Sequence, residues 1–226
     1  MLHYLYADQL HRFPHLRDGM FRDRARQFHE RLGWEVSVDD QGFERDAYDA
    51  LNPIYVIWQG AGGGHGGSMR FLPTTGRTMV NDHFSHLTGG VRIESPLIWE
   101  CTRFCLAPGA GRVVSAALTL GAGELMKAFH IKHFVGVFDQ RMRRIYRLMG
   151  VEPAVIGEDG DARNGIGVGL WSMDEAAFAP VLARVGISRA QSRRWIMESL
   201  GKTGTCGGSL LRSEPMNAMQ PTAAHG

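Results

Sequence analysis

This chain of 226 residues has few cysteines, few lysines and a small net charge. The chain has three cysteines, Cys101, Cys105 and Cys206. A number this small and odd argues against a disulfide framework and fits a reducing compartment. Lysine supplies 3 of the 25 basic residues, and the formal net charge is +2. That balance excludes a strongly basic protein, so composition gives no sign of nucleic-acid binding or of a membrane-surface protein.

Long apolar runs and targeting segments are also lacking. The longest uncharged stretch, residues 50–69, contains Asn52, Pro53 and many glycines, so we expect no membrane insertion. The N-terminus has no basic start followed by an apolar run, so no signal peptide is expected and a cytoplasmic location is predicted. We expect one domain over residues 1–200 and a flexible tail over 201–226, which is rich in Gly, Ser, Thr and Ala.

The hydrophobic pattern predicts strands and helices in alternation. Strands are expected at residues 2–6, 54–59, 67–72, 97–106, 133–138, 153–157 and 166–171. Helices are expected at residues 16–32, 113–129 and 140–149, after Ser172 and after Ser188. This order indicates an α/β (α+β) protein with one mixed, mostly antiparallel twisted sheet and helices on both faces.

The common ligand motifs are weak or absent. The glycine-rich segment 62–67 matches G-x-G-x-x-G, but it lies between two strands and opens no helix, so a hairpin loop is predicted. The pairs His83/His86 and His130/His133 lack a further ligand at a zinc-site interval, so we expect no metal site. No G-x-S-x-G elbow is present, and a serine hydrolase therefore has little support.

Charged residues inside apolar segments carry the most information. The set comprises Arg24, Arg70, Glu100, Arg103, Glu44, Asp46 and Asp49. A buried unpaired charge costs several kcal/mol, so these groups either neutralise one another in a functional cleft or form a structural ion-pair network. Glu100 and Arg103 are three residues apart and would face opposite sides of a regular strand. Either only one of them reaches the cleft, or a bulge redirects the other.

At these residues the sequence resembles the acyl-homoserine-lactone synthases, the LuxI-type autoinducer synthases, over roughly residues 1–185. The matching motifs, in order, are Arg24, Phe28 and Trp34; Glu44-Arg45-Asp46-Ala47-Tyr48-Asp49; Arg70 within residues 67–74; Phe84; and Trp99-Glu100-Cys101-Thr102-Arg103-Phe104. No single motif is decisive, but together and in this order they are highly specific.

The resemblance implies a GNAT-like acyltransferase fold and two substrates, with no tightly bound cofactor. One substrate is S-adenosylmethionine, and the other is an acyl chain on acyl-carrier protein or on coenzyme A. The methionine amine attacks the acyl thioester, the methionine carboxylate then closes a lactone, and 5′-methylthioadenosine leaves.

The resemblance also implies roles for the charged set. Glu100 is the candidate general base, directly or through a water. Asp46 and Asp49 bind the cationic side of S-adenosylmethionine or hold the arginines. Arg24, Arg70 and Arg103 bind the substrate carboxylate or lock those acids. The remaining candidates for substrate binding are Phe28, Trp34, Glu44, Phe84 and Thr102. Backbone N–H groups between residues 97–106 and 133–138 would stabilise the thioester oxygen.

The acyl donor is less defined. Arg141, Arg143, Arg144 and Arg147 crowd one short helix, either as a solvated face or as a docking patch for an acidic carrier protein. The pyrophosphate loop of coenzyme-A-dependent GNAT enzymes is missing at residues 112–117, which favours the carrier protein. Some members of the family that take 3-oxo chains have a threonine near the end of the matching strand. None occurs at residues 133–140, so the resemblance favours unsubstituted or 3-hydroxy chains. Candidate tunnel residues, each also compatible with ordinary core, are Leu118, Leu125, Met126 and Met142.

Two other functions are compatible with the sequence. One is a GNAT-like N-acyltransferase that uses acyl-coenzyme A on another amine, and the other is a binding module in which the charged set is structural. No exposed apolar repeat or heptad is evident, so we expect a monomer.

Overall fold

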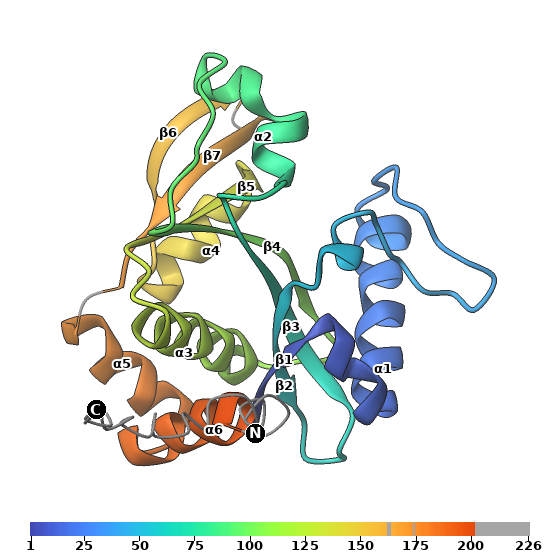
Figure 1. Ribbon diagram of the computed structural model, residues 1–226, viewed down its shortest axis with the longest axis vertical. Helices are drawn as coiled ribbons and strands as arrows, with labels where there is room; N and C mark the ends of the chain where they lie inside the picture. Colours follow the sequence, from blue (N-terminus) through green and yellow to red (C-terminus); the bar gives the residue numbers. More distant parts are fainter. Residues whose placement is uncertain (162–163, 174, 202–226) are drawn as a thin grey trace, which may run out of the picture.

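The computed structural model describes residues 1–161, 164–173 and 175–201, and a seven-stranded sheet runs through it (Figure 1). The strands are β1 Leu2–Tyr6, β2 Ile54–Gln59, β3 His65–Pro73, β4 Ile98–Leu106, β5 His133–Asp139, β6 Ala154–Asp159 and β7 Ile166–Trp171. Their order in the sheet is β1-β2-β3-β4-β5-β7-β6, and β4–β5 is the one parallel pair in it.

Helices cover both faces of this sheet, as predicted (Figure 1). They are α1 Pro14–Arg24, α2 Met79–His83, α3 Arg112–Ala128, α4 Met142–Met149, α5 Glu175–Val185 and α6 Arg189–Gly201. Helix α1 packs against β3 and β4 on one face, whereas α3 packs against β2 and β3 on the other. The predicted fold class is confirmed. Among the described helices, none is long and apolar enough to cross a membrane.

Strand β2 shows why the sheet is buried on both sides. Ile54 and Val56 belong to the core beneath α3, while Tyr55 and Ile57 belong to the core beneath α1. Successive side chains of a strand point to opposite faces, so an uninterrupted apolar run fills two cores at once. Each fully buried large apolar side chain contributes about 1.5–3 kcal/mol.

The first long helix changes its hydrogen-bonding pattern partway along. Pro14 starts α1, which runs as an α-helix to Arg24 and continues as a π-helix over Ala25–Arg31. The wider turn changes which side chains of residues 25–31 face the sheet, because a π-helix bonds each N–H to the carbonyl five residues back.

Strands β4 and β5 separate soon after they meet. Only Ile98–Glu100 pair with His133–Val135, although both strands continue beyond these residues. Strand β4 also carries a bulge, since Arg103 and Phe104 together face Met69 of β3. Arg103 has a φ of 52°, in the left-handed region. The bulge is the second of the two predicted alternatives, and it directs Arg103 toward the charged residues.

Candidate functional site

Three arginines and three carboxylates interlock between α1, β3, β4 and the segment that follows the π-helix. Arg24 is fully buried at the end of α1. Its Nε donates to Glu44 at 2.5 Å, and its two terminal nitrogens donate to both oxygens of Asp49 at 3.0 and 2.9 Å. A guanidinium has five donors in a planar fork, and this two-pronged contact with a carboxylate is among the strongest that it makes.

Arg70 closes the network from β3. Its terminal nitrogens donate to both oxygens of Asp46 at 2.5 and 2.9 Å, and one of them also donates to Asp49 at 2.8 Å. Its Nε donates to the Thr102 hydroxyl at 3.0 Å. Burial disfavours the charged form of Asp49, but Arg24 and Arg70 outweigh it and hold the pKa of Asp49 well below its usual range.

Arg103 completes the set and also reaches outward. Its Nη2 lies 2.8 Å from an oxygen of Glu44 and 2.8 Å from an oxygen of Asp46. Its Nη1 donates to the Met79 sulfur at 3.5 Å. Three positive and three negative charges therefore cancel within one cluster.

Glu100 lies apart from that cluster. The residue is 1% exposed. Its carboxylate accepts hydrogen bonds from the backbone N–H groups of Met79 at 3.0 Å and Val80 at 2.6 Å, at the start of α2. Burial raises the pKa of Glu100 to about 7, against the lowering effect of those two hydrogen bonds. A carboxyl group with this pKa can both accept and release a proton near neutral pH.

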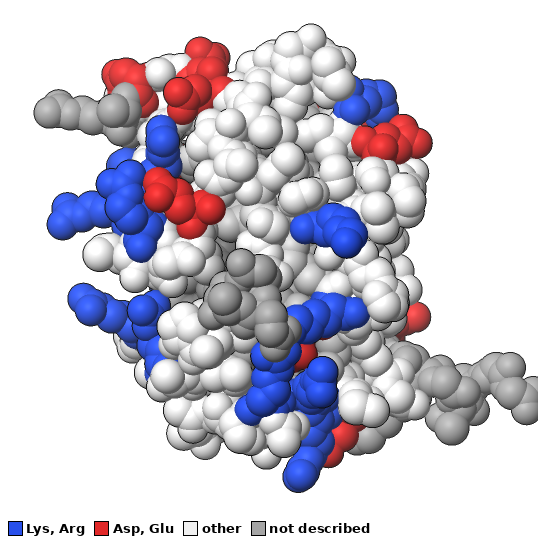
Figure 2. Space-filling view, turned by 90° about the vertical axis from the view of Figure 1, so that its left-hand side faces the viewer, with Lys and Arg blue, Asp and Glu red and all other residues white. Residues whose placement is uncertain are grey.

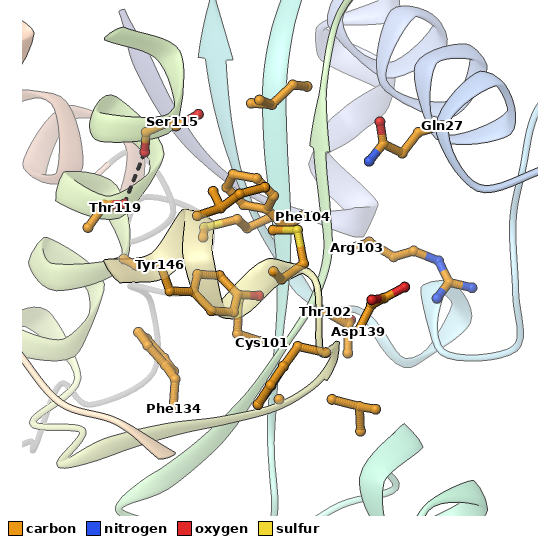
Figure 3. A pocket seen from close by; sticks show the side chains of 18 of the residues that line it. Gln27, Cys101, Thr102, Arg103, Phe104, Ser115, Thr119, Phe134, Asp139 and Tyr146 are labelled. Atoms are coloured by element: carbon orange, nitrogen blue, oxygen red, sulfur yellow. Dashed lines mark hydrogen bonds between the residues drawn. The ribbon is translucent and has the colours of Figure 1, made fainter. Parts of the chain in front are cut away.

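A cavity of about 760 Å³ opens beside these groups and enters the gap between β4 and β5 (Figure 3). One end is aromatic and charged: Phe28 and Trp34 stack with ring centroids 5.2 Å apart, near Phe84 and Arg103. The other end is largely apolar and extends toward α3 and α4, where Phe134 and Tyr146 line it. The size and the mixed lining are typical of a small-molecule site.

The predicted site residues divide between the wall of this cavity and the layer behind it. Those that line the cavity are Phe28, Trp34, Phe84, Thr102 and Arg103. Those that do not line it are Arg24, Glu44, Asp46, Asp49, Arg70 and Glu100. Of the tunnel candidates, Met126 and Met142 line the cavity, whereas Leu118 and Leu125 are fully buried in the core.

Three of the four predicted docking arginines, Arg143, Arg144 and Arg147, lie on helix α4, and Arg141 precedes it as the N-cap and lines the cavity. Figure 2 shows basic side chains in several groups on one face of the molecule, some of them with acidic side chains beside them. Arg143 pairs with Glu158 and Arg147 with Glu152. These exposed pairs are worth little in stability, so the arginines remain available for an anionic partner.

Three aromatic rings that contact one another edge to face at the apolar end of the cavity were not predicted from the sequence. Phe138, Tyr146 and Trp171 lie with centroids 5.3–5.8 Å apart, and all three line the cavity. They come from β5, α4 and β7, so no spacing along the chain connects them. Met79 was missed for a similar reason, because its position depends on how α2 folds back onto Glu100.

Known proteins are similar to this chain over most of its length. A family model described as autoinducer synthase matches residues 9–178. An acyl-homoserine-lactone synthase from Rhizobium etli is 41% identical over 180 residues, covering 76% of this chain and 84% of that protein.

Two solved structures extend the comparison. The fold is shared with BjaI, described as a CoA-dependent acyl-homoserine lactone synthase with SAM and isopentyl-CoA: TM-score 0.74, 20% identity, 83% of this chain and 90% of that one. TofI, in a ternary complex with an inhibitor and MTA, gives a TM-score of 0.62 at 26% identity over 76% of this chain and 90% of that one. The chain belongs to the autoinducer synthase family.

Proposed function

We propose that this protein synthesises an N-acyl-L-homoserine lactone from S-adenosylmethionine and an acyl thioester, with release of 5′-methylthioadenosine. One observation carries the proposal: a single cavity joins an aromatic, charged end to an apolar end through the gap between β4 and β5. The first end suits a nucleoside bearing an amino acid, and the second suits an acyl chain.

The reaction needs two bond exchanges. The neutral amine of the substrate attacks the thioester carbon, so a C–N bond forms, the C–S bond breaks and the thiol leaves with a proton. The substrate carboxylate then attacks its own γ-carbon, so a C–O bond forms and the bond to the sulfonium breaks. In the first exchange, negative charge develops on the thioester oxygen. Backbone N–H groups of β4 that β5 leaves unpaired beyond Glu100 are suited to stabilise it.

Glu100 is our candidate for the general base, and its place behind the cavity wall favours transfer through a water rather than direct contact. Its pKa of about 7 matches that task. Arg24 and Arg70 donate to carboxylates and do not line the cavity, so we assign them to locking Asp46 and Asp49. Arg103 does line the cavity and is the better candidate to bind the substrate carboxylate.

Helix α4 bears on whether the acyl donor is an acyl-carrier protein or coenzyme A. Its arginines beside the cavity rim support an acidic acyl-carrier protein as the donor, and coenzyme A thioesters are the alternative. We further propose that the protein acts as a cytoplasmic monomer. A GNAT-like N-acyltransferase acting on another amine remains the competing function, because the apolar end and the gap would serve it equally well.

A product assay by mass spectrometry separates these functions. The purified protein is supplied with S-adenosylmethionine and a panel of acyl-carrier-protein and acyl-coenzyme-A thioesters. We expect an acyl-homoserine lactone and 5′-methylthioadenosine in equal amounts, and the preferred thioester identifies the chain and carrier. Thioester consumption without 5′-methylthioadenosine would favour the N-acyltransferase instead.

A further inference from the structure

A second buried polar group lies between α1 and β3. The His65 side chain is fully buried, with Nδ1 2.7 Å from an oxygen of Asp23 and Nε2 3.0 Å from the Ser68 hydroxyl. Asp23 and Ser68 are themselves 9% and 2% exposed. Both ring nitrogens of His65 therefore have a hydrogen-bond partner, the Asp23 carboxylate at Nδ1 and the Ser68 hydroxyl at Nε2.

A glycine in α1 lets the helix come close to His65. Gly19 lies inside α1, where glycine costs about 1 kcal/mol relative to alanine. A Cβ at Gly19 would lie 2.9 Å from the Cβ of His65, so glycine is what lets the helix approach β3 at this point. His65 is the first residue of β3 and follows the glycine-rich hairpin directly. The hairpin therefore places this histidine against α1, which the glycine pattern alone did not predict.

The order Asp–His–Ser suggests a hydrolase triad, but the placement excludes one here. Ser68 is buried in β3 and does not line the cavity. A nucleophilic serine must reach the substrate carbonyl beside an oxyanion-stabilising site. Asp23 is the member of the group that lines the cavity, on the same helical wall as Gln27 and Phe28. The imidazole and the hydroxyl therefore support the carboxylate, and not the reverse.

Charge complementarity then indicates what Asp23 faces. S-adenosylmethionine carries a sulfonium and an ammonium group, and each needs an anionic neighbour once it leaves water. The carboxylates of the interlocked cluster are neutralised by three arginines and do not line the cavity. Two carboxylates do line it, Asp23 and Asp139, and Asp139 is held on both oxygens by Arg141. Among the described residues, the ionic partners of Asp23 are the imidazole and the half-exposed Arg26, whose Nη1 lies at 3.2 Å.

We propose that Asp23 binds the cationic end of S-adenosylmethionine, and that His65 and Ser68 are positioning residues that hold its carboxylate toward the cavity. This inference rests on the proposed function, since that function supplies the cation. It adds a binding residue outside the motifs that carry the family resemblance.

Binding of three ligands to Asp23→Asn, measured by calorimetry without an acyl donor, tests the proposal. S-adenosylmethionine has both cations, S-adenosylhomocysteine keeps only the ammonium, and 5′-methylthioadenosine has neither. We expect the Kd of S-adenosylmethionine to rise about 10-fold or more, because a charge-assisted contact is lost, and the Kd of 5′-methylthioadenosine to stay unchanged. A matching rise for S-adenosylhomocysteine assigns the contact to the ammonium, and no rise assigns it to the sulfonium.

The matched control is Asp18→Asn, which makes the same charge change on the same helix at a residue paired with Arg17. It should leave all three Kd values unchanged. An unchanged Kd of S-adenosylmethionine in Asp23→Asn would overturn the proposal, as would an equal rise for 5′-methylthioadenosine. Should the unaltered protein bind no S-adenosylmethionine, the proposed function itself would fail, which is a different result.

His65 variants test the positioning role and do not depend on Asp23→Asn folding. In His65→Asn the side-chain amide can still donate near the position of Nδ1, whereas His65→Leu has no donor. We expect His65→Leu to raise the KM for S-adenosylmethionine several-fold with kcat within about twofold, and His65→Asn to restore much of that KM. Equal losses in both variants, or a loss in kcat alone, would contradict positioning through the carboxylate.

Discussion

Glu100 meets two demands with one carboxylate: it pairs two backbone N–H groups at the start of α2, and we assign it the proton transfer. Both demands favour the ionised carboxylate, whereas burial favours the protonated acid. Folding favours the protonated acid, because burial raises its pKa from 4.5 to about 7, so its contribution to stability falls as the pH rises through that range. Activity through a base has the opposite slope, since only the ionised form accepts a proton.

Replacement of Glu100 by Gln should separate the two roles. We expect release of 5′-methylthioadenosine to fall by about 100-fold or more, the usual effect of losing a general base. An amide offers one acceptor where the carboxylate offered two, so unfolding should also become easier by about 1–3 kcal/mol. Turnover and urea unfolding measured on the same sample check both expectations. Full turnover in this variant would disprove the assignment of the base.

Arg24 illustrates the cost of breaking a closed charge network. Replacing Arg24 by Met leaves Glu44 and Asp49 with one cation fewer in a buried site, and we expect a loss of about 3–5 kcal/mol in the free energy of unfolding. The matched control is Arg17→Met, whose ion pair with Asp18 is half-exposed and should cost no more than about 1 kcal/mol. Similar losses for the two variants in urea would argue against a stabilising role for the cluster.

At the scale of secondary structure, the apolar runs predicted every strand of the sheet and the long helices to within a few residues. The bulge in β4 could only be posed as an alternative, because it depends on how β4 aligns with Met69 of the neighbouring strand. The π-helical continuation of α1 was not predicted, since residues 25–31 keep an ordinary helical pattern.

Helix α4 is where the choice of acyl donor can be tested. We expect the double variant Arg144→Glu/Arg147→Glu to raise the KM for an acyl-carrier-protein thioester by about 10-fold or more, since reversed charges repel an acidic partner. The KM for the same acyl group on coenzyme A should change much less. Arg92→Glu, an exposed charge reversal outside α4, serves as the control. Unchanged KM values would remove α4 from the docking surface.

At the scale of the whole molecule, the described part of the chain up to Gly201 contains the sheet, the cavity and the charged cluster. We therefore expect a chain shortened to residues 1–201 to keep its turnover, with a melting temperature within about 2–4 °C, the shift that roughly 1 kcal/mol produces in a domain of this size. A larger loss of either would show that residues 202–226 belong to the working domain, contrary to the boundary predicted from composition.

The charged set was predictable as a group, because a charge inside an apolar segment stands out in any sequence. Its division was not predictable: the sequence cannot tell that Arg103 reaches the cavity while Arg70 remains behind it. Asp23 and His65 were missed for the same reason, since an aspartate on a helix and a histidine in a glycine-rich loop look like surface residues until Gly19 brings their elements together.

The closed charge balance around Arg24, Arg70 and Arg103 has a consequence for ionic strength. Mobile ions screen exposed charges over about 8–10 Å but scarcely affect charges that are buried and already paired. Added salt should therefore leave the KM for S-adenosylmethionine nearly constant while it weakens the encounter of α4 with an acidic carrier. A single titration with sodium chloride, read against each substrate in turn, would distinguish the interior electrostatics of this enzyme from those of its surface.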